Sequence, residues 1–266
     1  MKSALIGHTG FVGGVLKAAG GYTDFYHSKN IETIKGAAFD TLVCSATPAT
    51  KWLANKEPEQ DWQSIQRLME ALATVKAKQF FLISTVDVFQ QPVGVDENSL
   101  VPTDGLQPYG AHRYAFEQFV RARFPAATIL RLPALFGPGL KKNALYDLIH
   151  SHEVEKVPRD GIFQWYNVRR LPADMQRAAG LPLVHLVTEP LALSSIIDEL
   201  FPHQKGCGKF GTAARYDLHT IHAARFGGSG SYVASADSVL QELAAYVAEE
   251  KTRLAQSQSI PQTVGV

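Results

Sequence analysis

Short strand-like runs alternate with longer segments of helical periodicity through the first half of the chain. The runs cover 4–6, 24–27, 41–44 and 80–83, and helical patterns cover 11–19 and 61–75. This order predicts parallel strands joined by crossover helices. Two later runs, at 128–132 and 183–187, are apolar at nearly every position, which is typical of strands covered on both faces. The pattern predicts an α/β fold with an open parallel sheet.

The second half of the chain lacks such clean alternation. We expect a core over 1–137, completed by about 183–200, and a small substrate lobe formed by 138–182 and 201–254. The lobe ends in a closing helix over 235–254, where Val239, Leu243 and Tyr246 are spaced for one apolar face. Residues 255–266 are polar and aperiodic, so we expect a flexible tail there.

Composition narrows the class of protein. Lys and Arg number 26 against 25 Asp and Glu, so the net charge of +1 provides no basic field for nucleic acid. No apolar stretch approaches the length of a membrane span. The nine histidines include no group with metal-ligand spacing, and two distant cysteines are typical of a reducing compartment. We therefore expect a cytoplasmic protein that binds neither membrane, nucleic acid nor metal.

A glycine loop follows the first strand directly and opens the first helix. Gly7 permits a tight turn, Gly10 lets the backbone approach a pyrophosphate, and Gly13 lets the helix pack close to the strand. The helix then presents free N–H groups and its positive end to the phosphates. The loop predicts a Rossmann-like, doubly wound fold that binds a dinucleotide.

The end of the second strand bears on the choice of cofactor. An acidic residue about 20 residues after the loop ordinarily binds the adenosine ribose, but here that place falls near His27, Ser28 and Lys29. Asp24 opens the strand instead of closing it. A hydroxyl and an ammonium suit a 2′-phosphate, so we expect NADP, with NAD as the alternative.

A hydroxyl, a phenol and a cation supply the candidate chemistry. Thr85 ends a buried strand, and Tyr109 and Arg113 lie four residues apart, on one face of a predicted helix. A cation beside a phenol lowers its pKa, as a tyrosine acting as general acid or base requires. The Thr85 hydroxyl would orient the reacting oxygen.

With these motifs the chain resembles the extended short-chain dehydrogenase/reductase family, the epimerase/dehydratase group that works mainly on nucleotide sugars. The resemblance covers most of residues 1–200 and includes the segment 129–139, which is similar to the one beside the nicotinamide. It implies Thr85, Tyr109 and Arg113 as catalytic residues. The candidate cofactor contacts are Gly7, Thr9, Gly10, Phe11, Val12, Gly13, Ser28, Lys29, Ser45, Ala46, Thr47, Tyr109, Arg113, Pro133 and Leu135.

The chain departs from the family pattern in two places. Arg113 stands where the family has lysine, which leaves open a second function: a catalytically impaired NAD(P)-binding protein that senses redox state or scaffolds a partner. Val86 replaces the first acid of a sugar dehydratase, which favours an epimerase or reductase. Substrate contacts are expected from Asp87, Tyr166 and Asn167.

The resemblance also implies a homodimer built on helices 61–75 and 109–122. Leu68, Leu72, Phe116 and Val120 would either supply the apolar contact between chains or face the sheet.

Overall fold

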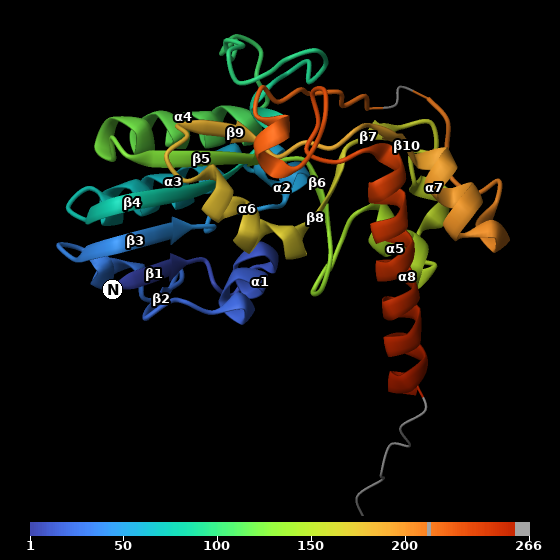
Figure 1. Ribbon diagram of the computed structural model, residues 1–266, viewed down its shortest axis with the longest axis horizontal. Coiled ribbons are helices and arrows are strands. Elements are labelled where there is room, and N and C mark those ends of the chain that lie inside the picture. The colour runs from blue at the N-terminus through green and yellow to red at the C-terminus, as the bar shows by residue number, and fades with distance from the viewer. Residues whose placement is uncertain (212–213, 259–266) are drawn as a thin grey trace, which may run out of the picture.

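The structure is a computed structural model that describes residues 1–211 and 214–258. Its centre is one parallel sheet of six strands in the order β2-β1-β3-β4-β5-β9 (Figure 1). The strands are β1 (Ser3–Ile6), β2 (Asp24–Tyr26), β3 (Ala38–Cys44), β4 (Lys76–Thr85), β5 (Ala127–Leu132) and β9 (Leu183–His185). The order in which strands are added to the sheet reverses between β1 and β3, as in a doubly wound sheet. This confirms the Rossmann-like α/β fold.

Helices cover both faces of the sheet, because successive strand residues point to opposite sides. On one face Leu5 packs with α1 (Phe11–Ala19) and α6 (Leu171–Ala178). On the other face Ala4 and Ile6 pack with α3 (Pro58–Leu72) and α4 (Pro108–Arg123). The helix expected over 61–75 therefore begins earlier, at Pro58, whose fixed φ suits a first helical turn. The short α2 (Lys51–Lys56) precedes it.

The two dimer helices direct their apolar residues into their own chain. Leu68, Leu72, Phe116 and Val120 are buried in the core between the sheet and these helices. Of the two alternatives for these residues, the structure therefore shows the sheet contact.

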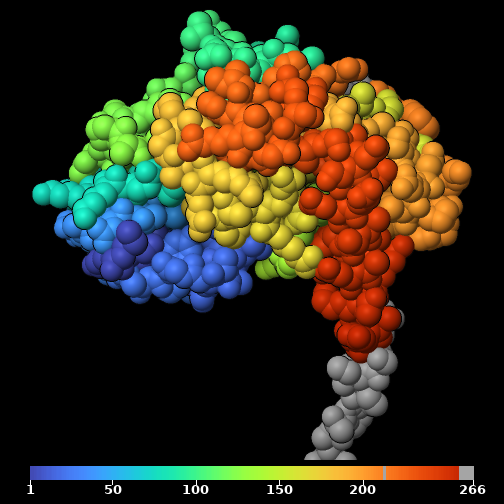
Figure 2. All heavy atoms as spheres, in the orientation of Figure 1, coloured from blue at the N-terminus to red at the C-terminus, as the bar shows by residue number. Residues whose placement is uncertain are grey.

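A second lobe packs beside the sheet and contains α5 (Ala144–His150), α7 (Leu193–Leu200) and α8 (Ala236–Gln258). Its short strands are β6 (Ala134–Phe136), β7 (Ile162–Phe163), β8 (Trp165–Asn167) and β10 (Leu191–Ala192). Figure 2 shows α8 running down the side of this lobe and projecting beyond it. Among the described residues, no helix has the length and apolarity needed to cross a membrane.

The boundary between the lobes differs from the expected one. Helix α6 falls within 138–182, yet Leu171 and Met175 pack on the sheet. Helix α7 falls within 183–200, yet Ile196 and Ile197 pack in the second lobe. Helix α8 continues to Gln258, four residues into the expected tail, and residues 259–266 lie outside the described part of the chain.

Candidate active site

A cleft of about 380 Å³ lies at the carboxyl ends of the central strands, at the point where the strand order reverses between β1 and β3. Most of the expected cofactor contacts line it: Gly7, Thr9, Gly10, Phe11, Val12, Ser28, Ser45, Ala46, Thr47, Tyr109, Pro133 and Leu135. Thr85 lines it as well, whereas Gly13, Lys29 and Arg113 do not. Residues from the ends of β1, β2, β3, β4 and β5 therefore meet in one cleft.

Two glycines at one end of the cleft are required by close backbone contacts. Gly7 has a φ of +87°, and a Cβ there would lie 2.6 Å from the Ser45 carbonyl oxygen. A Cβ on Gly13 would lie 2.0 Å from the Gly7 carbonyl oxygen. Helix α1 begins at Phe11 without a side-chain cap, so its first amides remain available to an anion in the cleft.

The end of β2 forms one side of the cleft. His27 and Ser28 line it, Lys29 is exposed beside it, and none of the residues described as lining the cleft is a carboxylate. Asn30 fixes this turn, because its side chain accepts from the His27 amide at 2.7 Å and donates to the Phe25 carbonyl at 3.1 Å. The sequence pattern does not predict this role of Asn30.

Tyr109 lies at the opposite end of the cleft, in the first turn of α4. Gly110 allows the start of α4 to lie close to the backbone at Asp87, since a Cβ there would lie 2.2 Å from the Asp87 carbonyl oxygen. Burial raises the pKa of Tyr109, and Asp87 adds to this effect. Arg113 and the hydrogen-bonding side chain of Thr85 act in the opposite direction. The phenol, the hydroxyl and the cation expected to act together are therefore neighbours.

Arg113 makes contacts that a lysine could not reproduce. Its two terminal nitrogens bind the Asp61 carboxylate at 2.5 and 2.8 Å, and one also donates to the Pro48 carbonyl at 2.5 Å. The guanidinium carbon lies 4.0 Å from the centre of the Tyr109 ring. The side chain is 2% exposed, so it binds the ring face and the interior rather than the cleft.

Asp61 completes this buried group from α3. His112 Nδ1 lies 2.7 Å from Asp61 Oδ2, the same oxygen that Arg113 binds. Burial alone raises the pKa of Asp61, but Arg113 and His112 together hold it below its usual value. Asp61 was not among the expected site residues, because nothing in its local pattern distinguishes it from a solvated helix charge.

A second buried ion pair lies beneath the cleft. Glu117 on α4 binds Arg131 on β5 through both oxygens, at 2.6 and 3.0 Å, and accepts from the Ser84 hydroxyl at 2.6 Å. Both charged side chains are at most 2% exposed. The pair ties the tyrosine helix to the strands that carry the cleft residues.

A smaller cavity of about 150 Å³ adjoins the cleft and shares Thr85 and Pro133 with it. Asp87, Gln164 and Tyr216 are among its other lining residues. The position next to Thr85 makes it the candidate pocket for the reacting group. The sequence does not predict Tyr216 as a site residue, because it comes from a segment without regular periodicity.

Two of the expected substrate contacts do not reach this cavity. Tyr166 is fully buried, and its hydroxyl donates to Asp174 Oδ2 at 2.7 Å. The Asn167 side chain accepts from the Arg169 amide at 3.1 Å. Within the polar run 164–170, Tyr166 thus packs with α6 on the sheet, and Gln164 alone lines the cavity.

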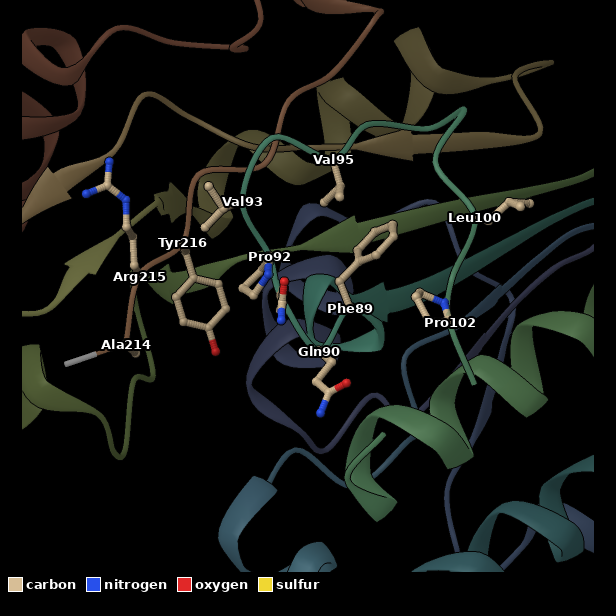
Figure 3. Close-up of a pocket in the computed structure, with 11 residues that line it drawn as sticks. Phe89, Gln90, Pro92, Val93, Val95, Leu100, Pro102, Ala214, Arg215 and Tyr216 are labelled. Carbon is tan, nitrogen blue, oxygen red and sulfur yellow. The ribbon is translucent and has the colours of Figure 1, made fainter. Parts of the chain in front are cut away.

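A wider groove of about 900 Å³ lies on the other side of Tyr216. Figure 3 shows Arg215 and Tyr216 on one side of it and Leu100 and Pro102 on the other, with Phe89 between. Tyr216 thus separates the small cavity from a larger, mainly apolar groove.

A match to a family model identifies the family of the chain. Residues 22–158, just over half of the chain, match the model described as the NAD dependent epimerase/dehydratase family. The chain belongs to the NAD dependent epimerase/dehydratase family. The match includes Thr85, Tyr109 and Arg113, and it confirms the resemblance inferred from the motifs.

Solved structures related to this epimerase/dehydratase chain share its fold over nearly its full length. MoeE5 in complex with UDP-glucose and NAD has a TM-score of 0.73 at 17% identity, covering 96% of this chain and 100% of its own. UDP-glucose 4-epimerase from Thermotoga maritima, with UDP-glucose, has a TM-score of 0.74 at 16% identity over 96% and 100%. The dTDP-4-dehydrorhamnose reductase from Bacillus anthracis, with NADP, has a TM-score of 0.72 at 19% identity over 93% and 99%. A comparison with curated protein sequences gives no match.

Proposed function

We propose that the protein is an NAD(P)-dependent epimerase or reductase that acts on a nucleotide sugar or a related alcohol or carbonyl compound. The observation that carries the proposal is the placement of Thr85 and Tyr109 at one end of a cleft whose other end is the glycine loop. Family membership and the nucleotide sugars bound by several structural relatives support it.

The residues of the cleft fit a nicotinamide dinucleotide. The close approach at Gly7 and Gly13 leaves backbone amides of α1 facing the place of a pyrophosphate. Ser28 and Lys29 would contact the adenosine ribose, and Pro133 and Leu135 the nicotinamide. When bound, the cofactor accepts or donates the hydride. Structural relatives bind NAD or NADP, and the absence of a carboxylate among the residues described at the end of β2 favours NADP here.

The chain's own residues supply the proton. During oxidation, the substrate hydroxyl loses its proton to the Tyr109 phenolate while hydride leaves the carbon, and reduction reverses both transfers. Thr85 would hold the reacting oxygen, since it lines both the cleft and the small cavity. Arg113 stabilises the phenolate from the face of the ring.

The small cavity favours redox chemistry over elimination. Val86, which lines it and is 2% exposed, cannot provide the acid that water elimination needs in addition to a base. Asp87 is the carboxylate of this cavity lining. We therefore place epimerase and reductase ahead of dehydratase.

A second candidate function rests on Arg113. Its guanidinium is bound by Asp61 and the Pro48 carbonyl, so it does not provide the cleft with the lysine ammonium that the family pattern implies. A protein that binds NAD(P) and senses or scaffolds without turnover would keep the glycine loop and tolerate this change.

Tyr109→Phe separates the two functions. We expect turnover of a UDP- or dTDP-sugar to fall by about 10²–10⁴-fold, the usual contribution of a general acid or base. The dissociation constant for NADPH should stay unchanged, because the glycine loop is untouched. Tyr114→Phe is the matched control, since it makes the same change on α4 outside the residues that line the cleft and the cavity. Full turnover in Tyr109→Phe would exclude the proposed mechanism, and NADPH binding without turnover by the parent would favour the second function.

A further inference from the structure

Asp87 and Tyr216 line the small cavity, and Lys51, from a distant part of the chain, contacts both of them. Lys51 Nζ lies 2.8 Å from Asp87 Oδ1 and 3.2 Å from the Tyr216 hydroxyl. The Tyr216 hydroxyl donates to the same Asp87 oxygen at 2.7 Å. We call Lys51, Asp87 and Tyr216 the clasp. It joins α2, the turn after β4 and the segment around residue 216.

The clasp is attached firmly to the tyrosine helix. Asn55, on the same short helix as Lys51, accepts a hydrogen bond from the Tyr109 amide at 2.9 Å. The Tyr216 ring stacks on Phe163, with ring centres 5.8 Å apart and planes inclined by 24°. The position of Lys51 is therefore coupled to the start of α4, and the position of Tyr216 to the wall of the cavity.

The charges around Tyr109 fall into two pairs. The groups that face Tyr109 are Arg113 on its own helix, Thr85 at the end of β4, Asp87 in the turn after β4, Lys51 on α2, and Tyr216. Arg113 is balanced by Asp61, which also contacts His112. Asp87 is balanced by Lys51, whose side chain is 46% exposed while that of Asp87 is 19% exposed. Without Lys51, the Asp87 carboxylate would face the phenol unneutralised.

We propose that Lys51 is a positioning residue of the reaction: it neutralises the Asp87 carboxylate beside Tyr109 and holds Tyr216 as the wall of the substrate cavity. The inference rests on the proposed function of Tyr109 as proton carrier. Lys51, on a different helix, would then fulfil part of the electrostatic role of the family's lysine, because Arg113 is bound in the interior.

The effect on proton transfer has a definite sign. Asp87 raises the pKa of Tyr109 and Lys51 lowers it. Removing Lys51 therefore raises the pKa of the phenol, whereas removing the Asp87 charge lowers it. Removing both should leave the pKa at or below that of the parent, because Asp87 has the larger effect of the two on Tyr109.

Lys51→Met, Lys51→Arg, Asp87→Asn and the double variant Lys51→Met/Asp87→Asn test the proposal. The first readout needs no substrate: the protein is labelled with ¹³Cζ-tyrosine, and the Tyr109 signal, identified by its loss in Tyr109→Phe, is titrated with pH. We expect a higher midpoint in Lys51→Met, a lower one in Asp87→Asn, and a near-parental one in Lys51→Arg. Lys56→Met, the same change elsewhere on α2, should leave the midpoint unchanged.

The second readout is the pH profile of alcohol oxidation. At pH 7 we expect Lys51→Met to be slower by about 3–30-fold, with the pH midpoint of the profile moved upward and restored by Lys51→Arg. An unchanged Tyr109 titration in Lys51→Met would overturn the proposal, as would an upward shift that persists in the double variant. If no nucleotide sugar is converted, the proposed function fails while the titration still decides the role of Lys51.

Discussion

The two ends of the cleft are built from different kinds of interaction. At the glycine end, backbone meets backbone: a Cβ on Gly13 would lie 2.0 Å from the Gly7 carbonyl oxygen, and side-chain charge plays little part. At the tyrosine end, side chains from four elements surround Tyr109, and paired charges such as Arg113 with Asp61 determine its environment.

This difference determines how each end tolerates change. A steric requirement at the glycine end fails at one position and leaves its neighbours unaffected. At the tyrosine end one substitution affects several residues, because removing one partner leaves another charge buried and unpaired. Substitutions chosen as matched pairs at the two ends test the contrast.

The largest effect is expected from Arg113→Met. It leaves the Asp61 carboxylate, 6% exposed, with His112 as its remaining side-chain partner, so the free energy of unfolding should fall by about 3–5 kcal/mol. The unfolding free energy of Arg113→Lys should lie between those of the parent and Arg113→Met, because an ammonium cannot bind both Asp61 oxygens and the Pro48 carbonyl. Urea denaturation measures the change, and Arg67→Met, on the exposed side of α3, should cost little.

The same variant carries a pH signature. The pKa of Asp61 lies below its usual value in the folded protein, so the stability it contributes is present above about pH 4 and is lost as the pH falls through the folded pKa. The stability gap between the parent and Arg113→Met should therefore narrow in acid. A gap that stays constant from pH 7 to pH 3 would show that Asp61 is not the group responsible.

Sequence patterns predicted the parts of the molecule that depend on local order. The strands of the sheet contain short apolar runs, and the alternation of these runs with helical patterns predicts a parallel sheet. The glycine loop predicted one end of the cleft, because the contact between Gly13 and the Gly7 carbonyl involves residues close together in the sequence. Thr85 and Tyr109 were found from a spacing that the family shares.

Other site features depend on long-range contacts that no local pattern reveals. Lys51 lies on a helix of six residues, too short to show periodicity, and meets Tyr216 only through the folded chain. Tyr166 belongs to a polar run, yet it faces inward because Asp174 satisfies its hydroxyl. Arg113 lies beside Tyr109 on one face of α4, as the spacing predicts, but its partner Asp61 comes from a separate helix.

The glycine end should show an abrupt contrast between adjacent positions. Gly13→Ala forces the start of α1 away from the Gly7 carbonyl, so we expect a loss of about 1–3 kcal/mol in unfolding free energy together with weaker NADPH binding. Gly14→Ala meets nothing within 4 Å and should be neutral or stabilising by up to about 1 kcal/mol. Thermal denaturation and fluorescence titration report the two quantities. Equal behaviour of the two variants would contradict a steric role for Gly13.

The smallest effect is expected at Lys29, an exposed charge that belongs to neither the backbone contacts nor the charge network. This lysine is exposed and stands beside the cleft lining, so its attraction for a 2′-phosphate is that of a solvated surface charge, about 0.2–1 kcal/mol. Lys29→Ala should therefore weaken NADPH by up to about fivefold, leave NADH unchanged, and lose most of its effect in high salt. Lys35→Ala, which removes a lysine paired with Glu32 in the following turn, is the control. If NADPH and NADH bind the parent equally, Ser28 and Lys29 do not select the cofactor; if the preference for NADPH survives Lys29→Ala, the selection comes from the backbone and hydroxyl of the turn fixed by Asn30.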